Sequence, residues 1–457
     1  MEHSPAFRQG RRRLLAAAPA MALLAAGCGR SAGAGRDRLT MWTFKQSHVK
    51  ALDAAAAAFT AQTGTKLAIQ AITPDDAFLT KVQAAARTND LPDVIEVHAN
   101  GDDLSFGGAG LLEDLAGAVG RSWLDTYLPQ VRKDGAVTAA QYRDSLTEGS
   151  KTMGVKEGQR FSVPLTVGTF GIVYADRRRL ASAGVTEPPA TWEQFIDTLA
   201  AVHRTDPKRG GITIGVQQPS TALEWLMQPM AFGMLGKERF QALFGSDPSK
   251  GFASADGQRV LTEYGRVTPY WMPGTAAKSI DDADLSFAQG KSAFLVGGTF
   301  TLAFLAANGA DPANIMTFPV PPPARAAIPG MQLSPFALTG LSVTRTSRRK
   351  DEAMAWLRFL SKPDVAADFG RAALDVPPNL LTGADREAVG PLLTTMLDSF
   401  GTGENAYNAG DTTYRPSLYD PGKVGAVLAG YTPLKSTGAR QTGNHISSMI
   451  KSYWAEQ

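Results

Sequence analysis

The side chains best suited to hold a polar molecule follow segments of expected regular structure. Asn100 and Asp102 come after the strand expected at residues 92–97. Glu224 and Trp225 open a helix after a polar loop. A carboxylate or a side-chain amide can bind two neighbouring hydroxyl groups, and an aromatic ring packs against C–H groups. The alternatives are an Asx-type turn with solvated acids for the first pair and core packing for the tryptophan.

Sequence patterns that carry catalysis or cofactor binding are incomplete in this chain. Gly290-Lys291-Ser292 has the end of a phosphate-binding loop, but Leu285 stands where that loop needs its first glycine. Gly29-Arg30-Ser31-Ala32-Gly33 has the letters of a nucleophile elbow without a strand before it or a helix after it. No histidine stands at a metal-binding spacing. We therefore expect no catalytic residue, no metal and no cofactor.

Short apolar runs alternate with helical patterns in the first hundred residues. Strands are expected at residues 39–44, 66–72 and 92–97, with one helix between each pair. Strands joined by single helices favour parallel pairing, and such sheets bind ligands at the carboxyl ends of their strands. The pattern predicts an α/β fold with Asn100 and Asp102 at that edge.

The middle of the chain again alternates short apolar runs with helical patterns, at a different spacing. Strands are expected at residues 161–165 and 171–174, and again at 292–296 and 337–343. Pro319 to Pro323 predicts a stiff surface connector between the later two.

Short motifs spread along the chain form one ordered series. They are Trp42-Thr43, Phe59 to Gly64, Leu91 to Ile95, Gly110 to Leu115, Val163-Pro164, Tyr174, Ala183 to Phe195, Phe287 to Ala293 and Gly297 to Phe300. Each motif alone is common, but their order and spacing are specific. Together they resemble family 1 of the extracellular solute-binding proteins of ABC importers.

The resemblance implies a type II periplasmic-binding-protein-like fold, in which two α/β lobes close on a ligand by hinge motion. The chain is expected to cross between lobes near residues 165–169, 334–340 and 376–380. The expected bounds are a first lobe of residues 38–166 plus 340–377 and a second lobe of residues 167–335 plus 380–457.

The resemblance also points to further ligand contacts. Phe300 stands where a member of that family carries a stacking ring, and Trp42 follows the first strand. Core packing is the alternative for Trp42 and for Trp271, a hinge role for Thr169, and a solvated loop for the run that carries Tyr414. The candidate ligand-binding residues are Trp42, Asn100, Asp102, Thr169, Glu224, Trp225, Trp271, Phe300, Tyr414 and Arg415.

The first residues have the parts of a bacterial export signal. Arg11 to Leu15 opens an apolar run too short to span a bilayer, and Cys28 follows the small residues 25–27. This resembles the lipoprotein box, so we expect removal of residues 1–27 and lipid attachment at Cys28, with simple signal cleavage as the alternative. A twin-arginine route and the general route both stay open. Residues 28–37 are expected to form a tether.

Charge and hydropathy restrict the possible partners. The 457-residue chain has a net charge of +3, and the four arginines and one glutamate among the first 27 residues account for it. The remainder is formally neutral, so we expect no nucleic-acid partner. After the signal, no stretch is apolar and long enough for a transmembrane helix. The length fits two or three domains.

These inferences together predict an exported, monomeric lipoprotein on the outer face of the cytoplasmic membrane. It is expected to bind a mono- or oligosaccharide without enzymatic activity and to deliver it to the transmembrane subunits of an ABC permease. One alternative is the same clamp for a polyol, a glycerol phosphodiester, a polyamine or iron, with Arg415 as the candidate cation for an anionic ligand. The other is an exported glycoside hydrolase, which needs two carboxyl groups ~5–9.5 Å apart.

Overall fold

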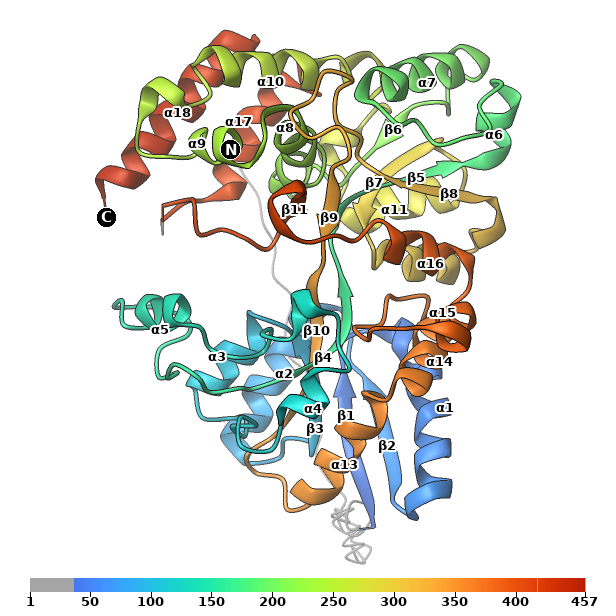
Figure 1. The fold of residues 1–457 in the computed structure, drawn as a ribbon, viewed down its shortest axis with the longest axis vertical. Coiled ribbons are helices and arrows are strands. Elements are labelled where there is room, and N and C mark those ends of the chain that lie inside the picture. The colour runs from blue at the N-terminus through green and yellow to red at the C-terminus, as the bar shows by residue number, and fades with distance from the viewer. Residues whose placement is uncertain (1–36, 417, 457) are drawn as a thin grey trace, which may run out of the picture. The chain divides into compact units, whose positions relative to one another are not determined.

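A five-stranded sheet gathers strands from distant parts of the chain (Figure 1). Its members are β1 (Arg38–Thr43), β2 (Lys66–Ala71), β3 (Val94–His98), β4 (Val163–Gly168) and β10 (Phe336–Val343). Their order in the sheet is β2-β1-β3-β10-β4. β1 pairs in parallel with β2 and β3, as the β-α spacing predicts. β10 pairs antiparallel with β3 and β4, because it arrives from a distant segment and not through a helical crossover.

A second, four-stranded sheet has the order β6-β7-β5-β8. Its strands are β5 (Phe170–Asp176), β6 (Ile212–Thr213), β7 (Phe294–Gly298) and β8 (Ile315–Pro319). β5 is antiparallel to both β7 and β8, so this sheet is also mixed. A two-stranded parallel sheet joins β9 (Gln332–Ser334) to β11 (Ala406–Asn408).

Helices cover both faces of the first sheet, and together they form what we call the first lobe. On one face, Met41 of β1 is fully buried and its sulfur accepts a hydrogen bond from Trp356. On the other, Ile95 and Val97 of β3 pack with Phe78 in a second core. The helices are α1 (Gln46–Thr63), α2 (Asp75–Thr88), α3 (Asp102–Gly108), α4 (Arg121–Leu124), η1 (Pro129–Val131), α5 (Ala139–Ser145), α13 (Lys350–Leu360) and α14 (Pro363–Ala373).

The second sheet and its helices form the second lobe. Residues 320–323 are buried in it, so the expected surface connector is wrong. The cause is a contact with a helix start, because Trp192 donates its backbone N–H to Pro322 O at 2.8 Å. Its α-helices are α6 (Arg177–Ser182), α7 (Trp192–Thr205), α8 (Gln228–Leu235), α9 (Lys237–Ala242), α10 (Ala255–Gly265), α11 (Ile280–Ala288), α12 (Thr301–Ala307), α16 (Pro391–Asp398), α17 (Pro421–Tyr431) and α18 (Ala439–Ala455). The short helix α15 (Gly383–Ala388) packs against α14 and α16. A π-helix, η2 (Ala222–Met227), precedes α8, and short 3₁₀ turns are η3 (Pro248–Lys250), η4 (Thr268–Tyr270), η5 (Thr275–Ala277), η6 (Pro312–Asn314) and η7 (Gly403–Asn405).

The chain passes between the two sheets three times. β4 continues through Thr169 into β5, and β9 leads into β10. A third passage follows α14, where Val167 of β4 donates its N–H to Val376 O at 2.9 Å. The predicted two-lobed α/β fold with several crossings is confirmed.

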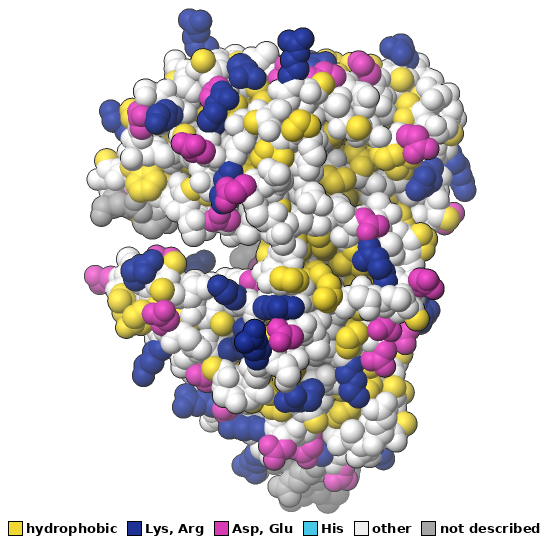
Figure 2. Space-filling model, viewed as in Figure 1, with side chains coloured by type: hydrophobic (Ala, Val, Ile, Leu, Met, Phe, Trp, Pro, Cys, Tyr) yellow, Lys and Arg dark blue, Asp and Glu magenta, His cyan; other side chains and the backbone are white. Residues whose placement is uncertain are grey.

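This computed structural model describes residues 37–416 and 418–456, and the described residues from Arg38 onward form one compact unit. The expected export signal, Cys28 and the tether up to residue 36 lie outside the described residues. Within the described part, no helix has the length and apolar character needed to cross a bilayer. Figure 2 shows positive and negative side chains interspersed over the face in view.

Candidate ligand-binding site

Four aromatic rings meet beside the first crossing between the lobes. The rings of Phe170 and Trp225 are stacked, with centroids 5.0 Å apart and planes 15° apart. Phe300 and Phe336 approach Phe170 edge-on, at centroid distances of 6.3 and 5.6 Å. Trp225 is only 7% exposed, whereas the three phenylalanines are partly exposed. We call these four residues the aromatic cluster; its exposed faces are apolar surface against which C–H groups can pack.

Glycines allow the chain segments at the crossing to approach one another. A Cβ on Gly298 would lie 2.3 Å from the Phe300 ring, and one on Gly168 would lie 1.6 Å from Thr299 Oγ1. Thr299 also donates its N–H to Thr169 O at 3.1 Å. Thr169 is fully buried, so it supplies backbone to the crossing and its side chain is not exposed to a ligand in this structure.

The π-helix η2 places a carboxylate next to the aromatic cluster. Wider turns of this kind are rare and occur often at functional sites. Glu224 immediately precedes Trp225, and its Oε1 lies 2.8 Å from Arg415 Nη1. Arg415 Nη2 donates to Gln228 Oε1, also at 2.8 Å. The guanidinium therefore orients two side chains on one helical segment.

Arg415 is enclosed by aromatic side chains. Its Nη2 also donates to Tyr414 OH at 3.1 Å, and the guanidinium carbon lies 5.0 Å from the centroid of the Tyr419 ring. Burial raises the pKa of Tyr414, so its hydroxyl stays protonated at neutral pH. Arg415 is 8% exposed and its charge is paired with Glu224, so it does not offer the free cation that an anionic ligand requires.

On the first lobe, the loop after β3 contacts the segment around Asp134, and this segment in turn is hydrogen-bonded to the backbone next to Phe336. Asn100 has a left-handed φ of 60°, and its Oδ1 accepts from Gly135 N at 3.5 Å. Asp134 Oδ2 accepts from Ala337 N at 2.6 Å, directly after Phe336. Burial raises the pKa of Asp134 to about 6, although the Ala337 N–H and the Asn100 amide act in the opposite direction.

Asp102 forms an ion pair at the carboxyl end of β3. Its Oδ2 lies 2.7 Å from His98 Nδ1, and the ring of Phe44 lies over the imidazole with centroids 4.3 Å apart. Burial lowers the pKa of His98, but the hydrogen bond and charge of Asp102, together with the charge of Asp75, outweigh burial, and the net pKa is raised. Asn100 and Asp102 thus lie at the strand end where the spacing places them.

Two of the candidate tryptophans make their contacts elsewhere. Trp42 lies inside β1, so the expectation that it follows this strand is wrong; it packs against the second core of the first lobe, with Lys81 Nζ 4.6 Å from its ring centroid. Trp271 donates its indole N–H to Thr432 Oγ1 at 2.8 Å. Neither ring contacts the aromatic cluster among the described residues. The structure brings together Glu224, Trp225, Phe300, Tyr414 and Arg415, and it adds Phe170 and Phe336, which the candidates lack. On the first lobe it adds Asp134, next to Phe336, and His98, next to Asp102.

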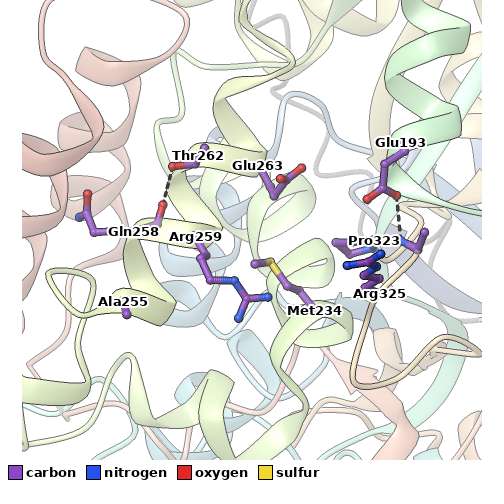
Figure 3. Close-up of a pocket in the computed structure, with 10 residues that line it drawn as sticks. Glu193, Met234, Ala255, Gln258, Arg259, Thr262, Glu263, Pro323 and Arg325 are labelled. Carbon is purple, nitrogen blue, oxygen red and sulfur yellow. Dashed lines mark hydrogen bonds between the residues drawn. The ribbon is translucent and has the colours of Figure 1, made fainter.

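Two hollows lie outside the aromatic cluster. The one in Figure 3, about 480 Å3, lies between α7, α8 and α10. Glu193 at its rim accepts from Ala324 N at 2.8 Å and Glu263 pairs with Arg266, so its acids already have partners. A second, of about 260 Å3, is lined by Tyr414 among others, and the hydroxyl of Tyr414 accepts a hydrogen bond from Arg415. Across residues 37–416 and 418–456, no group of three or more His, Cys, Asp or Glu is placed to hold a metal ion.

The family model for bacterial extracellular solute-binding proteins matches residues 45–367 of this chain. The chain belongs to this family. The family consists of binding proteins and not of enzymes. The match includes the aromatic cluster and the strand ends of the first lobe but stops before Arg415.

Individual relatives are more distant. The ABC transporter periplasmic-binding protein YcjN of Escherichia coli (strain K12) is 25% identical over 298 residues, which are 65% of this chain and 61% of that protein. The chain thus matches about three fifths of the length of that relative. The GacH receptor of Streptomyces glaucescens, solved unliganded and with acarbose, has a TM-score of 0.63 at 17% identity, covering 91% of this chain and 98% of the other. The sugar-binding protein MalE from Xanthomonas citri has a TM-score of 0.60 at 18% identity, covering 92% and 98%. These two likenesses confirm the fold.

Proposed function

We propose that this solute-binding protein is the receptor of an ABC importer, that it binds an uncharged carbohydrate between its lobes, and that it releases the sugar unchanged to the permease. The observation that carries the proposal is the aromatic cluster beside the Glu224 carboxylate. Support also comes from the sugar-binding description of the MalE protein and from the acarbose complex of the GacH receptor, which share the fold.

The chemistry of this arrangement suits a sugar ring. A pyranose has an apolar C–H face and a rim of hydroxyl groups, which suit an aromatic surface and a carboxylate, respectively. Arg415 holds one oxygen of Glu224, so the other oxygen can accept from a sugar hydroxyl. Asn100 and Asp102 would approach from the first lobe, so the ligand would be contacted from both sides on closure.

The charges around the site favour an uncharged ligand over the alternative solutes. Arg415 is paired with Glu224, Lys45 with Asp375 at 2.9 Å, and Asp102 with His98. A phosphodiester would need an unpaired cation, and a polyamine would need several unpaired carboxylates. A neutral hydroxyl-rich ligand leaves all of these pairs intact.

Export and anchoring complete the proposal. Residues 1–27 would be the signal, and lipid on Cys28 would keep a monomeric receptor on the outer face of the membrane beside its permease. The lobe bounds proposed are residues 38–166 plus 340–377 and residues 167–335 plus 380–457, so that two of the boundaries fall inside β4 and β10, the two strands of the first sheet that adjoin crossings. Replacement Cys28→Ser should release the exported protein from the membrane fraction, and retention in that fraction would contradict anchoring at Cys28.

A thermal-shift panel tests the ligand class. A chain of residues 29–457 would be heated with mono- and oligosaccharides, polyols, glycerol phosphodiesters, polyamines and iron, while the mixtures are analysed for hydrolysis products. A ligand at 100 times its Kd adds ~2.7 kcal/mol to the free energy of unfolding. Stabilisation by a neutral sugar without products supports the proposal. Stabilisation by a charged solute alone, or release of products, contradicts it.

A further inference from the structure

Four charged side chains lie together beneath the strand ends of the first lobe. His48, Glu96 and Asp375 are fully buried, and the Lys45 side chain is 19% exposed. His48 Nε2 lies 3.1 Å from Asp375 Oδ2, and His48 Nδ1 lies 3.0 Å from Glu96 Oε1. Lys45 Nζ lies 2.9 Å from the same Asp375 oxygen. We call Lys45, His48, Glu96 and Asp375 the ionic cluster.

Both ring nitrogens of His48 face a carboxylate. A neutral imidazole carries one N–H, so its other nitrogen would direct a lone pair at an oxygen of Glu96 or Asp375; an imidazolium donates at both positions. The contact of Nδ1 with Glu96 is an ion pair that does not meet hydrogen-bond geometry, whereas the contact of Nε2 with Asp375 does meet it. Protonated His48 and Lys45 balance the two carboxylates, whereas a neutral ring would leave an uncompensated buried anion.

Asp375 stands at the start of the third crossing. Its Oδ1 accepts from Val376 N at 3.0 Å, and Val376 O accepts from Val167 N of β4 at 2.9 Å. Val167 lies two residues before Thr169, where the first crossing begins. The ionic cluster therefore holds the start of the third crossing beside the first crossing.

The same cluster touches the elements that lead to the candidate site. Glu96 Oε2 accepts from Thr43 Oγ1 at 2.6 Å, at the end of β1, and Glu96 lies two residues before His98. The ring of the uncharged Phe369 of α14 also packs edge-on against His48, at a centroid distance of 5.2 Å. Burial lowers the pKa of His48, but Glu96 and Asp375 outweigh burial and the opposing charge of Lys45, so the net pKa is raised.

We propose that His48 is a positioning residue that remains an imidazolium at neutral pH and, through Asp375, holds the third crossing on the first lobe. It does not touch the ligand, and the proposal does not depend on which solute the chain binds. Loss of the proton at alkaline pH would free Asp375 from one of its two cations and loosen the crossing.

The protonation state can be measured on the unmodified chain. Long-range ¹H–¹⁵N spectra of histidine rings distinguish an imidazolium from the two neutral tautomers, and His48→Gln assigns the signal. We expect both His48 nitrogens to be protonated at pH 7, above the ordinary histidine value of ~6.5. A neutral ring at pH 7 would overturn the proposal.

Hydrogen exchange tests the positioning role. In His48→Gln, the amides of Val167 and Val376 should exchange at least tenfold faster than in the exposed-site control His445→Gln, with amides of α7 unchanged. Equal exchange at Val167 and Val376 in both variants would refute the role.

A second variant serves if His48→Gln does not fold. Lys45→Met removes the cation that opposes protonation of His48, so the imidazolium signal should persist to higher pH than in the unmodified chain. Loss of that signal at lower pH would contradict the proposed charge balance.

Discussion

Arg415 and Glu224 are joined at 2.8 Å although 191 residues separate them in the chain. The contact links a loop near the C-terminal helices to the π-helix that carries Trp225. The direction of the Glu224 carboxylate therefore depends on a residue outside the region that the family model matches.

Arg415→Met should weaken sugar binding and destabilise the second lobe. It leaves the partly buried Glu224 charge without its cation and Gln228 without one donor, at a cost of ~1–3 kcal/mol in unfolding free energy. Arg415→Lys should recover part of the loss, since lysine restores the charge but not the two-pronged geometry. Urea unfolding and calorimetry measure both effects. Unchanged affinity and stability in Arg415→Met would show that the pair has no such role.

Trp225→Ala should lower sugar affinity about 10- to 100-fold, because it removes the ring stacked on Phe170 and leaves a gap in the aromatic cluster. Trp271→Ala is the matched control, since it also removes an indole ring, with its hydrogen bond to Thr432, but at a place outside the cluster. Titration calorimetry with the same sugar compares the two variants. An equal loss of sugar affinity in both variants would show that the aromatic cluster is not part of the ligand site.

Gly168→Ala should destabilise the chain by ~1–3 kcal/mol, because the added Cβ would overlap Thr299 at the first crossing. Gly117→Ala is a control in an exposed turn, where an added Cβ meets nothing within 4 Å. Urea midpoints measure both. If Gly168→Ala is no less stable than the control, the close approach at the crossing is not required.

Asp134 should make stability depend on pH. Burial raises its native pKa from 3.8 to about 6, so the native state holds this proton more tightly than the unfolded chain. Its contribution is therefore complete below about pH 4 and is lost as the pH rises through about 6. The difference in unfolding free energy between the unmodified chain and Asp134→Asn, measured at several pH values from 4 to 7, isolates this group from other carboxylates. A difference that does not change with pH would contradict the raised pKa.

Local sequence patterns were sufficient for the first three strands and their helices, because each β-α unit is encoded by neighbouring residues. The sequence also predicts β10 as a strand, but its antiparallel insertion between β3 and β4 depends on contacts with segments far away in the chain.

The candidate site was only partly predictable for the same reason. A polar loop and the helix start that follows it indicate Glu224 and Trp225, and the family resemblance indicates Phe300. Phe170 and Phe336 were missed because each reads as an ordinary strand residue until the crossing brings the two rings within 5.6 Å. His48 and Asp375, 327 residues apart, likewise carry no local sign of their contact.

A crystal structure of residues 29–457 with the most stabilising sugar tests the central claim most directly. We predict a sugar ring packed on the aromatic cluster, with a hydroxyl within hydrogen-bond distance of Glu224. A sugar bound in the hollow of Figure 3, or anywhere without contact to that cluster, would contradict the account.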